Sequence, residues 1–294
     1  MLARLAGLRE RAGQLMTSTG PTRLQIAAGL RQLRERAGMT LEDVARAAKY
    51  GKSTVQRYED WRAGAKIQAR TVRALAEAAK GSAAEVAALV RLAEATDGWW
   101  VGSGVPEWLH PLVALESVAT EETVFVNSVV PGLLQTREYA RSIHLAEQVR
   151  KPEAEVEQLV DARMKRQTVL SRPNPIHLWV VLDQAVLRRV VGNREVMAEQ
   201  ITHLMEQARR PSVDVQILPF EAGAHAAGHG HFVNIAAGDT MRAVYVELLD
   251  GGVYKDAPEH VSLYTRAFEY LLSQAADATR SLAILAEACK EYMR

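Results

Sequence analysis

The sequence predicts two domains, an all-α N-terminal domain followed by a mixed α/β domain. Apolar residues first recur at helical spacing in short segments up to about residue 98, and later runs of strand length alternate with helical segments. The charge changes as well: residues 1–81 hold 16 Lys/Arg and 7 Asp/Glu (net +9), and residues 82–294 hold 20 and 28 (net −8). We therefore expect a flexible extension (1–20), an all-α domain (21–98) and an α/β domain (99–294).

The composition excludes several classes of protein. With 294 residues, of which 48% are hydrophobic, the chain can build about two domains with cores of their own. It has no apolar run near the ~18 residues that a membrane span needs and no signal-peptide pattern. Its one cysteine, Cys289, excludes an internal disulfide or a Cys-based zinc site. We expect a cytoplasmic, nucleoid-associated protein without a membrane partner.

The basic segment reads as a series of short helices. The first spans 22–38, with Ile26, Leu30, Leu33 and Ala37 on one face, and ends at Gly38. Further helices are expected around residues 72–79, ending at Gly81, and from a Ser82 cap to about Asp97.

Two helices between these form the most informative part of the chain. Thr40 and Asp43 make a capping pair that opens one helix, whose buried stripe is Leu41, Val44, Ala45 and Ala48. After a tight turn, Gly51 or Ser53 caps the next helix, which Val55 and Tyr58 anchor. The outward side chains of this second helix are polar: Lys52, Ser53, Thr54, Gln56 and Arg57.

This arrangement predicts DNA binding. Two short helices across a tight turn, the second beginning with polar side chains, form the layout that places a recognition helix in the major groove. Gln and Arg can pair bidentately with adenine and guanine edges, and the basic charge suits phosphates. A solvated basic face without a partner is the alternative.

These residues resemble a known family. The strings Arg31-x-x-Arg34-x-x-Ala37-Gly38-Met39-Thr40-Leu41-Glu42-Asp43-Val44-Ala45 and Ser53-Thr54-Val55-x-Arg57-Tyr58-Glu59 are similar to the phage-repressor-like (Xre-type) helix-turn-helix family. The resemblance implies that the helix that follows Gly51, the third of the domain, reads base edges with the residues at its start. It also implies that Glu59 is a helix-end or salt-bridge residue. The DNA-binding candidates are Lys52, Ser53, Thr54, Gln56, Arg57, Thr40 and Tyr50.

The chain departs from the family in and around the turn. Leu41 stands where many members carry a phosphate-clamping Gln, and Asp60-Trp61 replaces the usual Gly after the acidic residue. Lys49 and Tyr50 stand where Gly and a small aliphatic residue are usual, so Tyr50 is either a core residue or a backbone or base contact. The turn 49–51 is where we expect unusual geometry.

Residues 1–20 differ from the rest of the basic segment. Leu2, Leu5 and Leu8 alternate with arginines. This stretch is a basic arm that reaches phosphates, a mobile tail, or a segment upstream of a start at Met16.

The acidic segment predicts an α/β domain. Its expected strands are 124–130, 178–182, 213–217, 231–235 and 243–249, the last turning at Asp250-Gly251-Gly252 into residues 253–254. The expected helices lie near 136–149, 153–171, 194–209, 257–274 and 277–292.

This domain also resembles one family. The strings that carry the resemblance are Pro131-Gly132-Leu133-Leu134-Gln135-Thr136, Ala162-Arg163-Met164-x-Arg166-Gln167, Leu182-Asp183-x-Ala185-Val186-Leu187-Arg188-Arg189, Val213-x-Val215-Gln216-x-Leu218-Pro219-Phe220 and Tyr245-Val246-Glu247. They look like the C-terminal domain of actinobacterial Xre-type regulators of the WhiJ kind and of antitoxin-like proteins. The resemblance implies regulation, often with a small protein encoded nearby, and supplies no catalytic residues.

Few residues are candidates for metal binding or catalysis. His225, His229 and His231 are either metal ligands or incidental loop residues, and Cys289 is read as a small buried hydrophobe. Asp183 and Glu247 line a pocket, pair with arginines (Arg163, Arg166, Arg188 or Arg189) or face water. Trp99, Trp100 and Trp108 favour interdomain packing, with an aromatic ligand cage as the alternative. Phosphate-loop and nucleophile motifs are absent from the sequence, so we expect no catalytic residue, metal or cofactor.

The sequence therefore favours a cytoplasmic, sequence-specific regulator that binds double-stranded DNA as a homodimer on paired half-sites. Its α/β domain would sense an effector or partner, or mediate dimerisation. The alternative is an antitoxin-like protein that sequesters a small partner and regulates its own operon. A third hypothesis, an enzyme with a DNA-targeting domain, is disfavoured by the missing motifs.

Overall fold

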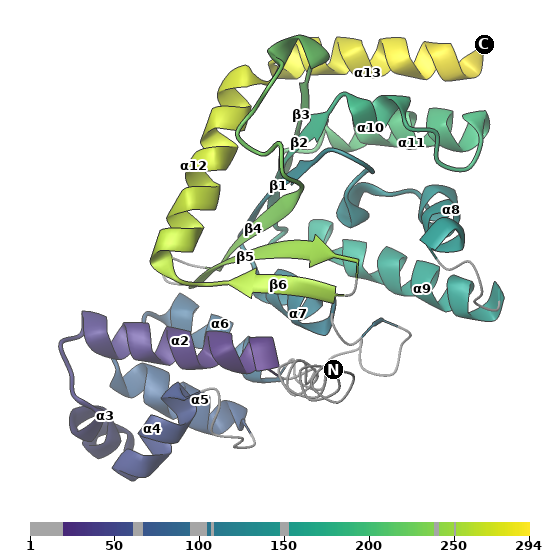
Figure 1. The fold of residues 1–294 in the computed structure, drawn as a ribbon. Coiled ribbons are helices and arrows are strands. Elements are labelled where there is room, and N and C mark those ends of the chain that lie inside the picture. Colours follow the sequence, from purple (N-terminus) through teal and green to yellow (C-terminus); the bar gives the residue numbers. More distant parts are fainter. Residues whose placement is uncertain are drawn as a thin grey trace, which may run out of the picture. The chain divides into compact units, whose positions relative to one another are not determined.

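The computed structural model describes residues 20–60, 67–94, 105–106, 109–147, 153–237, 241–249 and 251–294. They form two compact units, one helical and one built on a six-stranded sheet (Figure 1). The predicted combination of an all-α and a mixed α/β domain is confirmed. The following predicted features lie outside the described residues: the extension 1–19, the boundary between residues 98 and 99, and Trp61, Trp99, Trp100 and Trp108.

The first unit holds a set of short helices and the adjoining ends of two strands, β4 and β5. Its helices are α2 (Gly20–Arg36), α3 (Leu41–Ala48), α4 (Lys52–Glu59), α5 (Ala69–Ala78), α6 (Ala83–Glu94) and α7 (His110–Val118). Helix α7 was not predicted, because its residues are buried almost all round and leave no amphipathic stripe. It packs against α2 and α6.

Helix α2 is the centre of this unit. Its residues Ile26, Leu30 and Leu33 are buried at helical spacing, and the helix contacts α4, α5 and α6. It ends at Arg36, two residues before the predicted end, and Gly38 follows with a φ of 65°. The Gly38 N–H donates to the Glu35 carbonyl and the Met39 N–H to the Arg34 carbonyl, which satisfies the last turn.

The second unit is built on a sheet with the strand order β3-β2-β1-β4-β5-β6. Strands β1, β2 and β3 are parallel, whereas β5 and β6 are antiparallel, so the sheet is mixed. The strands are β1 (Glu121–Val126), β2 (His177–Asp183), β3 (Val213–Leu218), β4 (Phe232–Ala237), β5 (Met241–Leu248) and β6 (Gly251–Lys255).

Helices cover both sides of this sheet. Helix α12 packs on the side that carries Phe125 and Trp179, with Phe268 and Leu271 in the shared core, whereas α8, α9 and α11 lie on the opposite side (Figure 1). The helices are α8 (Arg137–Glu147), α9 (Glu153–Arg166), α10 (Ala185–Arg188), α11 (Arg194–Gln207), α12 (Pro258–Gln274) and α13 (Ala278–Met293), with short 3-10 turns η4 (Gly132–Leu134), η5 (Gln167–Leu170) and η6 (Phe220–Ala222).

Strand β1 and helix α9 both end well before their predicted ends. Strand β1 ends at Val126, not at residue 130, because side chains bind the backbone of Val130: its N–H donates to the Tyr139 hydroxyl (3.2 Å), and its carbonyl accepts from Gln135 Nε2 (2.7 Å). Helix α9 ends at Arg166 and continues as the turn η5 instead of reaching residue 171. None of the helices in the described ranges combines the length and apolar composition needed to cross a membrane.

Candidate nucleic-acid interface

The start of α3 is fixed by the predicted capping pair. The Asp43 N–H donates to Thr40 Oγ1 (3.2 Å), and the Thr40 N–H donates to Asp43 Oδ2 (3.0 Å). The Thr40 hydroxyl also donates to Asp43 Oδ2 (2.7 Å), and this bond, with the one from the Thr40 N–H, lowers the pKa of Asp43 below its ordinary value, so the carboxylate is ionised at neutral pH. The Thr40 hydroxyl is thus engaged within the helix start.

The turn between α3 and α4 has the unusual feature that the sequence flagged. Lys49 takes the left-handed conformation, with a φ of 59°, and the Tyr50 N–H donates to the Ala45 carbonyl (3.0 Å). Glycine adopts this conformation at lower cost, since a side chain there costs about 1–2 kcal/mol. The turn therefore keeps a standard helix ending with a lysine in the glycine position.

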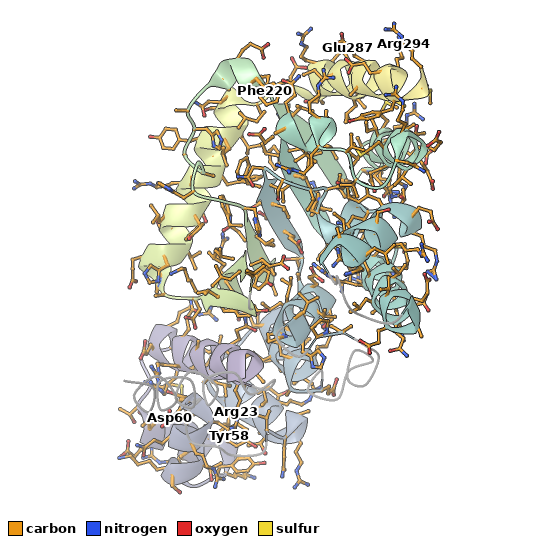
Figure 2. All side chains as sticks on the ribbon, turned by 45° about the vertical axis from the view of Figure 1, so that its right-hand side comes forward. Arg23, Tyr58, Asp60, Phe220, Glu287 and Arg294 are labelled. Carbon is orange, nitrogen blue, oxygen red and sulfur yellow. The ribbon has the colours of Figure 1, made fainter. Side chains whose placement is uncertain are left out.

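Helix α4 has one apolar and one polar face. Val55 and Tyr58 are buried beneath it, and the Tyr58 hydroxyl accepts from the Gln68 N–H (3.2 Å). Figure 2 shows Tyr58 among the helices of the first unit, beside Arg23. Of the two predicted caps, Gly51 is the N-cap, without a side-chain hydrogen bond, and Ser53 is not.

An ion pair ties the end of α4 to α2. Glu59 is only 5% exposed and binds Arg34 through two contacts of 2.8 Å, Nε to Oε1 and Nη2 to Oε2. Arg31 Nη2 also donates to the Glu59 carbonyl (2.7 Å). The hydrogen bond to Glu59 raises the pKa of Arg34. The predicted structural role of Glu59 is confirmed.

A second pair of the same type joins α2 to α6. Arg36 binds Glu85 through contacts of 2.7 and 2.9 Å, and Glu85 also accepts from the Ser82 N–H at the start of α6 (2.7 Å). The predicted Ser82 cap is confirmed, since Ser82 Oγ accepts from the Glu85 N–H (3.3 Å). The two ion pairs hold α4 and α6 to one central helix.

The seven predicted DNA contacts fall into two groups. Three are engaged within the fold: Thr40 with Asp43, Lys52 in an ion pair with Glu42, and the half-buried Tyr50, whose hydroxyl lies 3.4 Å from Thr71 Oγ1. The other four side chains form no hydrogen bond or ion pair with any part of the chain that the structure describes. They are Ser53, Gln56 and Arg57, which are exposed, and Thr54, which is half-buried.

In the second unit, the predicted histidine candidates do not come together. His225 lies against the Phe125 ring (5.2 Å between centroids), and its Nδ1 accepts from the Ala227 N–H (3.3 Å). Its Nε2 is 3.7 Å from Asp183 Oδ2, whereas His229 is exposed elsewhere in the loop. Within the described residues, no three His, Cys, Asp or Glu side chains are placed to hold a metal ion.

Of the alternatives for Asp183 and Glu247, the structure does not show the pairing with arginines among the described residues. Asp183 accepts from the Ala185 N–H (2.8 Å) at the start of α10 and faces His225, whereas Arg188 pairs with Glu291 of α13. Glu247 is exposed on β5, as a strand residue that faces water. Cys289 is buried, its Sγ 3.7 Å from the Ala198 carbonyl, so its reading as a small core residue is confirmed.

Two of the strings that carried the second resemblance, 131–136 and 162–167, meet in a partly buried polar cluster. Gln135 Oε1 accepts from Arg163 (2.8 Å), and Gln167 Nε2 donates to the Gly132 and Gln135 carbonyls (2.9 and 2.8 Å). Gln200 of α11 completes it, since its Nε2 donates to the Leu134 carbonyl (2.7 Å) and its Oε1 accepts from the Thr136 N–H (2.7 Å). The cluster fixes the loop after β1. Gln200 was missed, although an amide among the buried residues Met197, Ile201 and Leu204 is a signal for such a role.

Fold and surface together define a helix-turn-helix protein with an appended α/β domain. Residues 25–94 match a family described as a helix-turn-helix domain. Residues 109–287 match the family described as a domain of unknown function (DUF5753), and because this match covers more than half of the chain, the protein belongs to that family. Neither a curated protein nor a solved structure matches the chain significantly.

Proposed function

We propose that the protein is a sequence-specific, DNA-binding transcriptional regulator of the Xre type that presents α4 to the major groove. The observation that carries the proposal is the two-sided character of α4. One face of the helix is held against the rest of the unit by the buried residues Val55, Tyr58 and Glu59. The other face presents Ser53, Gln56 and Arg57 to solvent, without partners among the described residues. A net charge of +9 over residues 1–81 suits a phosphate backbone.

One copy of α4 reads a short stretch of DNA. Eight residues at 1.5 Å each give a helix of about 12 Å, which spans roughly three to four base pairs. Two or three base contacts, worth about 1–3 kcal/mol each, supply about 2–9 kcal/mol, whereas specific binding exceeds non-specific binding by roughly 4–10 kcal/mol, so one copy reaches that range only when its contacts are strong. A homodimer on two half-sites about 34–36 Å apart would double the contacts.

The α/β unit would supply the dimer contact or the regulation. The net charge of −8 over residues 82–294, most of which belong to this unit, opposes a direct phosphate contact by this part of the chain. Leu263 and Tyr270 lie two turns apart on α12 and are 58% and 64% exposed, which supports burial against a second copy.

The second candidate function is an antitoxin-like protein whose α/β unit sequesters a small partner encoded nearby. It rests on the resemblance of this unit to antitoxin-like regulators and on the same exposed α12 residues. Genome-wide footprinting separates the two functions. Many sites favour a regulator with several targets, and one site at the protein's own promoter, beside a small open reading frame, favours the antitoxin-like function.

The direct test uses the footprinted operator. Gln56→Ala and Arg57→Ala should each weaken operator binding by about 1–3 kcal/mol, or roughly 5- to 150-fold, with far less change on an unrelated duplex. Arg91→Ala is the matched control, because Arg91 is exposed on α6, which packs against α2, α5 and α7. Equal affinity of both variants and wild type for the operator would reject α4 as the recognition helix.

A further inference from the structure

The first residue of the proposed recognition helix already has an anionic partner. Lys52 opens α4, and its ammonium group forms an ion pair with the carboxylate of Glu42, the second residue of α3. Both side chains are about half-exposed, at 55% and 51%. The pair therefore lies at the surface, on the turn that α4 would bring to DNA.

The carboxylate of Glu42 is charged at neutral pH. Its pKa is lowered chiefly by the hydrogen bond from Lys52, and the neighbouring Asp43 opposes this effect. Asp43 itself is engaged by Thr40 and lies 3.5 Å from Arg46. The positive charge of Lys52 is thus balanced within the protein before any DNA arrives.

We propose that Glu42 is a built-in competitor for DNA phosphates, which holds Lys52 in the free protein and lowers the affinity for every duplex. The inference rests on the proposed DNA-binding function and concerns its regulation. When DNA binds, a phosphate competes with the carboxylate of Glu42 for Lys52, and Glu42 repels the phosphates as a like charge.

This competition weakens binding without regard to sequence. A lysine that is free in solution gains a phosphate contact and releases condensed counterions, which steepens the salt dependence of binding by about 0.9 in log–log slope per contact. A lysine that must first leave a carboxylate contributes less binding free energy, because the ion pair with the carboxylate is lost when the phosphate contact forms. Specific binding then depends on the base contacts of α4, because non-specific affinity is held down.

The test compares Glu42→Gln, Lys52→Gln, the double variant and wild type, all as full chains, on an unrelated duplex and on the footprinted operator over a salt series. We expect Glu42→Gln to bind both duplexes about 3- to 10-fold more tightly at 0.1 M salt, with a slope steeper by up to about 0.9, because Lys52 is shared between the carboxylate and a phosphate in the wild-type complex. Lys52→Gln should cost less than about 2-fold in wild type and about 5-fold or more in the Glu42→Gln background.

Glu94→Gln on α6 is the matched control, since it removes an exposed carboxylate from a helix that packs away from α4. It should leave the salt slope unchanged. Thermal unfolding of each variant shows whether the fold is intact, and the slope reports phosphate contacts that a merely structural role would not alter.

Three outcomes would overturn the proposal. Unchanged affinity and slope in Glu42→Gln would show that the pair does not compete. Weaker operator binding with unchanged non-specific binding would show that Glu42 instead positions Lys52 as a base reader. Additive effects of the two substitutions would show that the residues act separately. If no variant, wild type included, binds any duplex at low salt, the DNA-binding function itself fails, which is a distinct result.

Discussion

The ion pair between Arg34 and Glu59 should control the stability of the helix-turn-helix unit. Substituting Glu59 by Met leaves the Arg34 guanidinium, whose side chain is 15% exposed, without its carboxylate. Breaking a buried ion pair from one side costs about 3–5 kcal/mol. Arg34 keeps a contact with Glu35 Oε1 (3.4 Å), a hydrogen bond to the Met39 carbonyl (3.2 Å) and partial access to water, so we expect about 2–4 kcal/mol here.

The assay is native-state hydrogen exchange of the α4 amides in the full chain, because two units need not unfold in one transition. Arg34→Met, Glu59→Met and the double variant form a thermodynamic cycle. Each single substitution should lower the free energy of opening by about 2–4 kcal/mol, and the double variant should recover part of the loss, since it leaves no unpaired buried charge.

Arg46→Met is the matched control, because the side chains of its pair with Asp43 are 79% and 40% exposed. It should change the free energy of opening by less than about 0.5 kcal/mol. Single-variant losses below about 0.5 kcal/mol, or a double variant equal to the sum of the singles, would refute the role given to the Arg34–Glu59 pair.

Two further outcomes follow from local features. Lys49→Gly should stabilise α3 and α4 by about 1 kcal/mol in the same exchange assay, because glycine takes a φ of 59° without the side-chain cost, and a loss of stability would contradict this account of the turn. Burial lowers the pKa of His203 below its ordinary 6.5, so folding favours the neutral ring. The stability that His203 contributes is present above pH 6.5 and is lost as the pH falls through the lowered value. His203→Gln should therefore reduce the acid sensitivity of urea unfolding, and an unchanged pH profile would be inconsistent with the shift.

Local signals in the sequence were the most reliable. The Thr40–Asp43 capping pair was predicted because both partners lie within one helical turn, and the burial of Val55 and Tyr58 follows from helical spacing. The resemblance predicted the structural role of Glu59. Its partner Arg34 lies 25 residues away in the sequence, so the pairing could be identified only from the structure. Unusual geometry at Lys49 was predicted because the related family usually has glycine there, whereas its left-handed conformation is known only from the structure.

Tertiary contacts explain what the sequence could not supply. Val129 and Val130 suit a strand, yet Tyr139 and Gln135 bind the Val130 backbone and the strand ends at Val126. Helix α7 is apolar on most sides, so it showed no helical stripe. The parallel register of β1, β2 and β3 depends on long crossovers, which leave no local pattern in the chain.

The central claim is that α4 reads bases, and single-base discrimination tests it most directly. The measurement is the affinity of wild type, Gln56→Ala, Arg57→Ala and Arg91→Ala for the operator and for every single-base variant of one half-site, at fixed salt. The account predicts that Arg57→Ala loses discrimination at one base pair and keeps it elsewhere, whereas Arg91→Ala keeps the wild-type profile. A wild-type discrimination profile in Arg57→Ala and in the corresponding Gln56→Ala variant would contradict the claim.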